Sequence, residues 1–315
     1  MTQALAFVFP GQGSQAIGML ADLAEQHAVI GETFTEASEA LGYDLWKVCQ
    51  QGSEEQLNRT DITQPAILAA SVALWRLWCA QTELRPSHVA GHSLGEYSAL
   101  VAAQVLGFAD ALKLVERRGQ LMQQAVPQGQ GGMAAILGLE DQQIIDICAQ
   151  AAQGEVVSAV NFNAPGQVVI AGQAAAVERA IAGCKEAGAK RAIALPVSVP
   201  SHCALMQSAA EQLAVDFRDL NWGQPQLTLV QNVTARPAAD LNQLRTLLVQ
   251  QLYSPVRWVG TVGWMAEQGV TDLVECGPGK VLSGLNKRCV KGLNTYNLES
   301  ADGFATALAQ LTQGA

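Results

Sequence analysis

Charged and aromatic residues are scarce in this chain of 315 residues, at 15% and 5% of the total. Hydrophobic residues reach 49%, which excludes a disordered chain and predicts a large buried core. Basic residues are outnumbered, and a formal net charge of −9 argues against a nucleic-acid-binding protein. Apolar runs of roughly 20 residues, long enough to span a membrane, are missing. The start, "MTQALAFVFPGQGSQ", lacks the basic region of a signal peptide. We therefore expect a cytoplasmic protein without a membrane partner.

Paired cysteines are also missing. The seven cysteines lie far apart, without a CxxC spacing, a pattern typical of reduced thiols rather than of disulfides or a zinc site. They are Cys49, Cys79, Cys148, Cys184, Cys203, Cys276 and Cys289. We therefore expect no bound metal.

Strand and helix patterns alternate along most of the chain. A buried strand is predicted at 4–10, and a short strand at 86–93 leads into a helix at 94–106. Later, a strand is predicted at 226–233 and a strand-turn-helix at 271–285. Such alternation predicts an α/β fold with a largely parallel sheet that helices cover on both faces.

The segment between residues 129 and 199 has a different pattern. It reads strand, helix, strand, strand, helix, strand, the order of a ferredoxin-like unit. Glycine-rich "PQGQGG" (127–132) and proline-containing "LPVSVPSH" (195–202) flank it like hinges. We therefore predict a small domain, 128–198, inserted into a larger one formed by 1–127 and 199–315.

The sequence Gly-His-Ser-Leu-Gly at 91–95 fits G-x-S-x-G, in which a sharp strand-to-helix turn exposes a nucleophilic serine, Ser93. The alternative is a serine that caps a helix, but the predicted strand before it and helix after it favour the nucleophile. The backbone N–H of Leu94 would then face a developing oxyanion. A second N–H is expected from the loop 11–15, which is otherwise an ordinary glycine turn.

Four histidines are candidates for the base that such a serine needs. His27 and His88 lie in segments expected at the surface, and His92 adjoins Ser93, where neighbouring side chains diverge. His202 lies where the chain leaves the small domain, in the kind of loop where active-site residues gather. His202 is therefore the predicted base.

An acid that would orient His202 is not evident. Asp110, Asp141 and Asp146 lie between Ser93 and His202 but fall at helix starts or on helix faces. A glutamine side chain or a backbone carbonyl would fix the imidazole instead and would stabilise its cation less. This arrangement suits thioesters, which are activated acyl donors.

The helix predicted at 108–126 carries an arginine near the middle of its apolar face. At about 100° per residue, Arg118 falls within that face and Arg117 at its edge. A buried guanidinium needs an anion, which is either an internal carboxylate or the carboxylate of a substrate.

"GPGK" at 277–280 lacks the P-loop spacing and is interpreted as a turn that opens a helix.

Eight motifs in order make the chain resemble the malonyl-CoA:acyl carrier protein transacylases of bacterial fatty acid synthesis. They are "FVFPGQGSQ" (7–15), "TQPA" (63–66), "GHSLGEYSAL" (91–100), "ERRGQLMQ" (116–123), "NFNAPGQVVIAG" (161–172), "VSVPSHCALM" (197–206), "QLYSPVRW" (251–258) and "ECGPGKVLSGL" (275–285). The resemblance implies an α/β-hydrolase-like core with a ferredoxin-like insertion. It also implies ping-pong transfer of malonyl from CoA to the phosphopantetheine of acyl carrier protein, without a cofactor.

The resemblance also assigns roles to individual residues. Ser93 would be the nucleophile and His202 the general base and acid, with Gln251 as a neutral supporting residue. Backbone N–H groups of Gln12 and Leu94 would form the oxyanion hole, and Arg118 would bind the malonyl carboxylate. Polar residues expected to line the cleft are Gln64, Asn161, Asn163 and Asn232.

Two other functions share parts of this pattern. A serine esterase or thioesterase would use the same turn but transfer to water, and a buried Arg118 without an evident acid counts against it. A non-catalytic carrier-binding homologue would be expected to lack Ser93 or His202.

Because acyl carrier protein and this chain are both acidic, docking is predicted to need a local basic patch of Lys190, Arg191, Lys280, Lys287 and Arg288.

Overall fold

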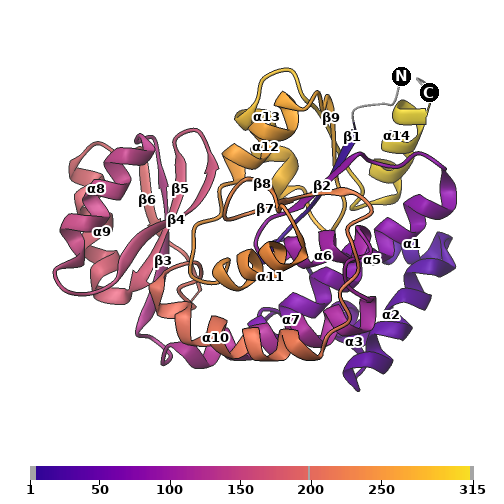
Figure 1. Cartoon of the computed structure of the whole chain (residues 1–315), viewed down its shortest axis with the longest axis horizontal. Helices are drawn as coiled ribbons and strands as arrows, with labels where there is room; N and C mark the ends of the chain where they lie inside the picture. The colour runs from indigo at the N-terminus through magenta and orange to yellow at the C-terminus, as the bar shows by residue number, and fades with distance from the viewer. Residues whose placement is uncertain (1–4, 198, 313–315) are drawn as a thin grey trace.

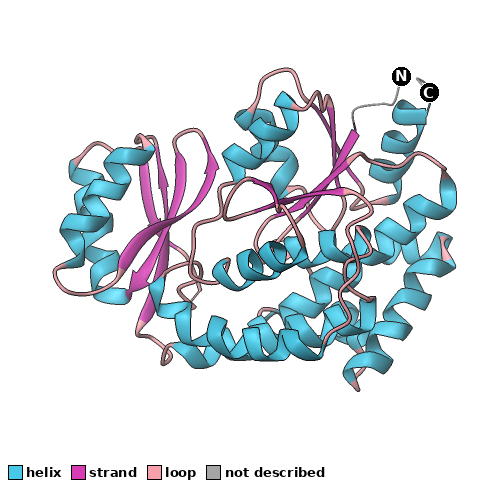
Figure 2. Cartoon of the chain, viewed as in Figure 1, coloured by secondary structure: helices cyan, strands magenta, loops and turns pink. Residues whose placement is uncertain are grey.

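A six-stranded sheet forms the centre of the larger part of the molecule (Figures 1 and 2). The computed structural model describes residues 5–197 and 199–312. The strands lie in the order β10-β9-β1-β2-β7-β8, and all neighbours pair in parallel except β7 and β8. Their bounds are β1 Leu5–Phe9, β2 His88–Gly91, β7 Thr228–Gln231, β8 Arg236–Pro237, β9 Asp272–Glu275 and β10 Asn294–Asn297. The predicted α/β fold with a largely parallel sheet is confirmed.

Strand β1 shows why this sheet needs cover on both faces. Leu5, Phe7 and Phe9 join one apolar cluster, whereas Ala6 and Val8 join another. Successive side chains of a strand point to opposite faces, and all five residues of β1 are buried. Such continuous apolar strands are typical of parallel sheets that lie between two layers of helices.

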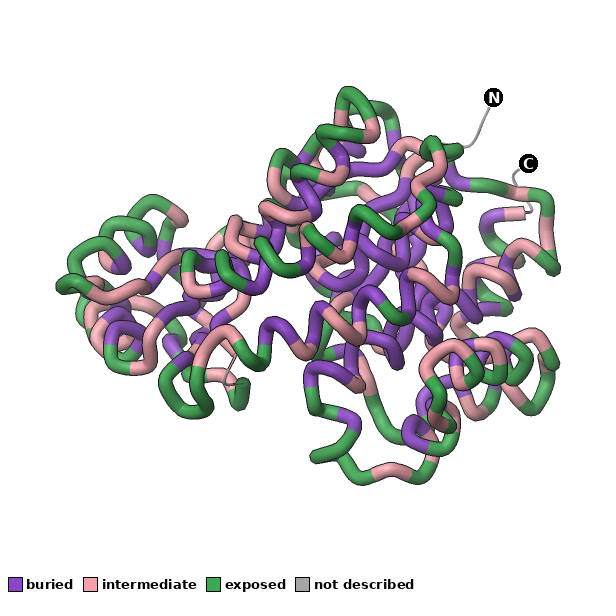
Figure 3. The backbone as a smooth tube through the Cα atoms, turned by 60° about the horizontal axis from the view of Figure 1, so that its bottom comes forward, coloured by how far each residue is buried: buried purple, intermediate pink, exposed green. Residues whose placement is uncertain are grey.

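The helices divide between these two faces. Helices α5 (Thr60–Gln81), α6 (Gly95–Ala102), α7 (Phe108–Ala125) and α14 (Ala301–Thr312) contribute to the cluster of Phe7, and α12 (Trp258–Glu267) and α13 (Val281–Cys289) to that of Val8. The others of this part are α1 Ala21–Gln26, α2 Ala28–Leu41, α3 Leu45–Gln51, α4 Glu54–Leu57, α10 Gln207–Asp216 and α11 Leu241–Gln250, with short 3-10 helices at Ala204–Met206 and Phe217–Asp219. Figure 3 shows buried backbone concentrated in this core.

A second sheet stands to one side of the first (Figure 1). Its antiparallel strands lie in the order β4-β5-β3-β6, with bounds β3 Gly131–Leu137, β4 Val157–Ala164, β5 Gln167–Gln173 and β6 Arg191–Ala194. Helices α8 (Asp141–Ala152) and α9 (Ala174–Glu186) pack on one face in a separate apolar cluster. The element order predicted for this segment is therefore present.

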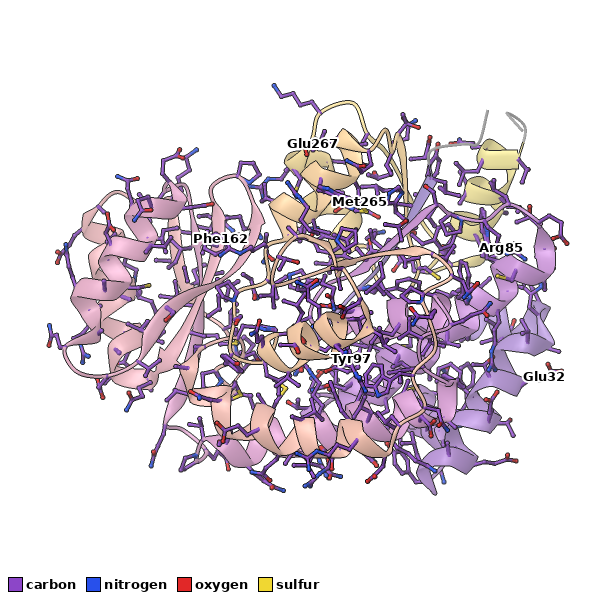
Figure 4. The ribbon with its side chains drawn as sticks, viewed as in Figure 1. Glu32, Arg85, Tyr97, Phe162, Met265 and Glu267 are labelled. Carbon is purple, nitrogen blue, oxygen red and sulfur yellow. The ribbon has the colours of Figure 1, made fainter. Side chains whose placement is uncertain are left out.

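Strand β4 connects the second sheet to the larger part. The N–H of Phe162, labelled in Figure 4, donates to the Val256 carbonyl over 2.9 Å, and the N–H of Val256 donates to the Val160 carbonyl over 2.8 Å. Asn161 and Val256 form a parallel bridge. One edge of the second sheet is thus continued by backbone hydrogen bonds to the larger part.

Candidate active site

The turn after β2 has the geometry that the Gly-His-Ser-Leu-Gly pattern predicts. Ser93 has a φ of 52°, in the left-handed region that side chains disfavour. A Cβ at Gly91 would lie 1.9 Å from the Gly95 carbonyl carbon, and one at Gly95 would lie 2.0 Å from the Phe9 carbonyl oxygen. Both glycines are therefore required by steric contact, and the turn holds Ser93 at the start of α6.

Ser93 and His202 form a hydrogen-bonded pair. The Ser93 Oγ lies 2.7 Å from His202 Nε2, and His202 Nδ1 lies 2.6 Å from the backbone carbonyl oxygen of Gln251. Because a carbonyl only accepts, Nδ1 carries the proton and Nε2 accepts from the serine hydroxyl. Burial, with the nearby Arg118 cation, lowers the pKa of His202 to about 3, so the imidazole is neutral and can act as a base.

Gln251 supports this pair in two ways. Its backbone carbonyl orients His202, which decides between the two neutral acceptors that the sequence left open. Its side chain does something else, because Nε2 donates to the Ser93 carbonyl over 2.8 Å and Oε1 accepts from Arg118 Nη2 over 3.0 Å. Gln251, a neutral residue, therefore contacts His202, Ser93 and Arg118.

Arg118 lies inside the molecule, only 1% exposed. Nη1 donates to Gln64 Oε1 over 2.8 Å, and Nη2 also reaches Ser93 Oγ at 3.4 Å. The guanidinium lies 5.4 Å from the ring centre of Tyr97, which Figure 4 labels in the core. Within the described residues it forms no salt bridge, whereas half-exposed Arg117 pairs with Asp216. Burial lowers the pKa of Arg118, and the cation beside Ser93 lacks a hydrogen-bonded anion.

A cavity of about 550 Å³ opens over these groups, lined by Gln12, Ser93, Leu94, Arg118 and His202 among others. The backbone N–H groups of Gln12 and Leu94 have no hydrogen-bond partner in the described part of the chain. The N–H of Ser93, in contrast, donates to Asn232 Oδ1 over 2.7 Å. Two free N–H groups beside a nucleophile are what an oxyanion hole requires.

The four amide residues expected to line the cleft separate into two groups. Asn161 lines the cavity, and its Oδ1 is buried without a partner among the described residues. Gln64, Asn163 and Asn232 lie behind the wall, because their amides bind Arg118, His92 and Ser93. The expectation that these three line the cavity is corrected: they orient residues that do.

The remaining histidines have structural partners. His92 Nε2 donates to Asn163 Oδ1 over 2.7 Å, and its ring lies 5.5 Å from that of Trp258. The side chain thus points away from the Ser93 hydroxyl, as predicted. His27 precedes α2, and His88 begins β2; both are partly exposed and lie outside the cavity lining.

Sequence reasoning gave no role to Glu96, which lies one helical turn after Ser93. It is 1% exposed, and its Oε2 accepts from Gln251 Nε2 over 2.8 Å and from the Asn232 N–H over 3.2 Å. Burial raises the pKa of Glu96 to about 7, although these hydrogen bonds oppose the shift. A carboxylate directly before the apolar run "YSALVAA" (97–103) was the available signal.

The "GPGK" turn has a structural explanation. Glu275, at the end of β9, accepts from the N–H groups of Leu282 and Ser283 at 3.0 and 2.7 Å. These are N–H groups of the first turn of α13, which a carboxylate satisfies well. The turn therefore opens a helix, as predicted from its spacing.

Metal-binding and membrane-spanning features are absent from residues 5–197 and 199–312. There, no group of three or more His, Cys, Asp or Glu side chains is placed to hold a metal ion. No helix within these ranges has the length and apolar character needed to cross a bilayer. The seven cysteines, all described, are free thiols.

Comparison with known proteins gives consistent matches over nearly the whole chain. The family model for the acyl transferase domain matches residues 6–302. A malonyl CoA-acyl carrier protein transacylase of Haemophilus influenzae is 60% identical over 300 residues, covering 95% of this chain and 96% of the relative. The Escherichia coli K12 protein of that name is 58% identical over 308 residues, covering 98% and 99%.

Solved structures agree with these matches. A Vibrio cholerae acyl carrier protein S-malonyltransferase superposes with a TM-score of 0.95 at 59% identity, covering 97% of this chain and 100% of that one. A malonyl-transacylase in complex with a type II polyketide synthase acyl-carrier protein gives a TM-score of 0.96 at 56% identity, covering 97% and 99%. The chain therefore belongs to the acyl transferase family, with the malonyl CoA-acyl carrier protein transacylases among its near relatives, as its motifs predicted.

Proposed function

We propose that this enzyme transfers the malonyl group of malonyl-CoA to the phosphopantetheine thiol of acyl carrier protein, supplying the extender unit for fatty acid synthesis. One observation carries the proposal: a serine and a neutral histidine, 2.7 Å apart, share a cavity with a buried arginine that has no hydrogen-bonded anion. The pair attacks an acyl group, and the cation selects one that carries a carboxylate.

The first half-reaction begins with malonyl-CoA in the cavity. His202 takes the proton of Ser93 as Oγ attacks the thioester carbonyl, and the oxyanion binds the N–H groups of Gln12 and Leu94. The tetrahedral intermediate collapses, His202 protonates the departing CoA sulfur, and malonyl-Ser93 remains. The Gln251 carbonyl stabilises the transient imidazolium less than a carboxylate would, and a thioester demands less of its base.

The second half-reaction reverses these steps. The phosphopantetheine thiol gives its proton to His202 and attacks the Ser93 ester, and Ser93 recovers a proton as the new thioester leaves. Throughout, Arg118 binds the malonyl carboxylate, which replaces its weak contact with Ser93 Oγ by a charge-assisted hydrogen bond. No bound cofactor or metal enters these steps, so we expect activity to persist in chelator.

The intact-protein mass after mixing with malonyl-CoA tests this mechanism. We expect the parent, but not Ser93→Ala, to gain the mass of one malonyl group and to lose it when phosphopantetheinylated acyl carrier protein is added. An adduct that water removes equally fast without the carrier would identify a thioesterase instead. A parent that forms no adduct would refute the serine mechanism.

Contacts between the two parts of the molecule bring some of the predicted basic residues close together, which supports docking of an acidic carrier there. Arg288 contacts the side chain of Gln167 and the carbonyl of Pro165, and the turn there approaches Gly138, which lies against Lys190. Of the other predicted members, Arg191 and Lys287 are exposed and Lys280 pairs with Glu299 at 3.3 Å. We propose that this patch, Lys190, Arg191, Lys280, Lys287 and Arg288, steers the carrier protein.

Charge reversal separates docking from chemistry. We expect Lys287→Glu to raise KM for the carrier protein several-fold and to leave acylation by malonyl-CoA unchanged. Lys113→Glu, on exposed α7 surface outside the patch, is the matched control. Equal loss in both half-reactions would contradict the docking role.

We further propose that 1–127 and 199–315 form an α/β-hydrolase-like domain and 128–198 a ferredoxin-like one. The strand order β4-β5-β3-β6 supports the second and the turn after β2 the first. Limited proteolysis of the full chain should then cut first within 127–130 and 195–199, and first cuts inside β3 or β5 would contradict these boundaries.

We place the enzyme in the cytoplasm, where free thiols stay reduced.

A further inference from the structure

Glu96 occupies a position that the proposed chemistry does not use. It is the second residue of α6, it is buried, and a single oxygen of its carboxyl group, Oε2, accepts two hydrogen bonds. One comes from the side chain of Gln251, after α11, and the other from the backbone of Asn232, after β7. Glu96 therefore joins three segments that are far apart in the sequence.

Both partners of Glu96 hold the reacting pair. Asn232 accepts from the Ser93 N–H over 2.7 Å and donates through Nδ2 to the Gly91 carbonyl over 2.6 Å. Gln251 donates to the Ser93 carbonyl over 2.8 Å and accepts from His202 Nδ1 through its own carbonyl. The backbone on both sides of Ser93, and the orientation of His202, thus depend on residues bound by Glu96.

Such support is needed because the reacting residues have unfavourable backbone conformations. Ser93 has a φ of 52° and His202 a φ of 66°, and a non-glycine residue in the left-handed region costs about 1–3 kcal/mol. Conformations of this kind persist only where the surroundings fix them. The hydrogen bonds of Asn232 and Gln251 fix Ser93 from two sides.

We propose that Glu96 is a positioning residue that holds Gln251 against His202 and Asn232 against Ser93, so that the nucleophile and base are aligned before substrate binds. The inference rests on the proposed roles of Ser93 and His202. Glu96 acts through the position of its acceptor oxygen rather than through its charge, because both hydrogen-bond donors are neutral amides. It makes no hydrogen bond to Arg118 among the described residues.

Two substitutions distinguish the position of the Glu96 acceptor oxygen from its charge. Glu96→Gln keeps an acceptor oxygen at the same distance and loses the charge, whereas Glu96→Asp keeps the charge and withdraws the oxygen by one methylene. The readouts are the second-order rate at which phenylmethanesulfonyl fluoride modifies Ser93, and the rate of malonyl adduct formation. We expect Glu96→Gln to stay within about threefold of the parent and Glu96→Asp to fall about 10- to 100-fold in both rates, as a displacement near 1 Å does.

Ser98→Ala is the matched control for disturbance of α6. Ser98 is buried on the same helix, and its hydroxyl has no partner among the described residues, so this variant should react like the parent. Thermal melting of each variant separates lost stability from lost alignment. A Glu96→Asp enzyme that reacts like the parent would overturn the proposal, and so would a Glu96→Gln enzyme, folded at the parent's Tm, that reacts tenfold more slowly.

The parent's own behaviour distinguishes failure of this inference from failure of the proposed function. If phenylmethanesulfonyl fluoride labels Ser93 of the parent but the malonyl group passes only to water, the proposed transfer function fails. The order of the variants' labelling rates then still tests the role of Glu96. If the parental label falls on another residue, the roles of Ser93 and Glu96 fail together.

Discussion

The two sheets contribute different things to the same cavity. Gln12, Ser93 and Asn232 each follow a strand of the parallel sheet, β1, β2 and β7, and parallel strands bring their carboxyl ends to one edge. The antiparallel sheet contributes Met133, Asn161 and Val169 to the wall, none of which ionises. The first sheet thus positions the nucleophile, whereas His202 comes from the loop after β6, and the second sheet shapes the space around both.

Backbone geometry explains this division. In the parallel sheet a sharp turn can follow each strand and open a helix, so polar groups from segments far apart in sequence converge. In the antiparallel sheet the β4-β5 connection is a short turn at 165–166, and the face that includes Met133 and Val169 is largely apolar. Substitutions in the two sheets should therefore have different effects.

The largest effect is expected at the reacting pair itself. His202→Ala removes the base, and acylation of Ser93 should slow about 10³-fold or more, which corresponds to about 4 kcal/mol. His88→Ala, on β2 but outside the cavity lining, is the control and should retain parental rates. Rapid-quench mass spectrometry measures both, and a loss below tenfold in His202→Ala would remove the histidine from the mechanism.

The turn after β2 should tolerate no side chain at Gly95. An alanine Cβ there would lie 2.0 Å from the Phe9 carbonyl oxygen, so Gly95→Ala should lower the free energy of unfolding by more than about 4 kcal/mol. Gly263→Ala in α12 meets nothing within 4 Å and should change it by about 1 kcal/mol or less. Urea unfolding checks the pair, and similar midpoints for both variants would contradict the steric argument.

Acyl selectivity should depend on the buried cation. Arg118→Ala should reduce the preference for malonyl-CoA over acetyl-CoA about 100-fold, or about 3 kcal/mol, because a desolvated charge pair is lost. Arg117→Ala, which breaks only a half-exposed pair with Asp216, should leave selectivity intact. The ratio of kcat/KM for the two thioesters is the measurement, and an unchanged ratio in Arg118→Ala would refute the carboxylate clamp.

The pH dependence of stability should report the buried carboxyl group. The pKa of Glu96 is raised from 4.5 to about 7 in the folded protein, so the folded state binds more protons than the unfolded one between these values. The parent's stability from this group is present below pH 4.5 and is lost as pH rises through 7. Relative to Glu96→Gln, the parent should lose up to about 3 kcal/mol across this window.

The parent and Glu96→Gln share every other titratable group near Glu96, including Arg118 on α7 and Tyr97 on α6, so the difference between their free energies of unfolding isolates Glu96. Urea unfolding at a series of pH values gives the difference directly. A constant difference between pH 4 and 8 would show that Glu96 has an ordinary pKa. Such a result would leave its two hydrogen bonds, and hence its positioning role, untouched.

The smallest effect is expected where the antiparallel sheet meets the turn. Asn163→Ala removes the hydrogen bond to His92 and should cost about 1 kcal/mol of stability. The acylation rate at saturating malonyl-CoA should stay within twofold, because Asn163 does not line the cavity. A tenfold fall in that rate would mean that the second sheet also positions reacting groups.

Local patterns predicted much of this structure. The glycines at 91 and 95 belong to the Gly-His-Ser-Leu-Gly motif, which by itself predicts a sharp turn, and the buried position of Arg118 follows from helical periodicity. His202 was found by elimination among few histidines. Each of these inferences needed only neighbouring residues or composition, so the sequence sufficed.

Contacts between distant segments were not predictable in this way. Glu96 lies 136 and 155 residues from its partners Asn232 and Gln251, and no local pattern records such pairs. The carbonyl of Gln251, rather than its side chain, orients His202 because the chain after α11 approaches the loop of His202. The expectation that Asn163 and Asn232 line the cavity failed for the same reason. The direction of a polar side chain depends on hydrogen-bond partners that only the fold supplies.

The attachment of β4 to Val256 limits the mechanical freedom of the second sheet. Two backbone hydrogen bonds along one strand resist translation and shear at that edge, whereas rotation about the strand stretches them least. The easiest rigid-body displacement is therefore a rotation with its axis near β4, and the amplitude grows with distance toward β6 at the opposite edge. Asn161, which lines the cavity from β4, would be displaced least by such a rotation.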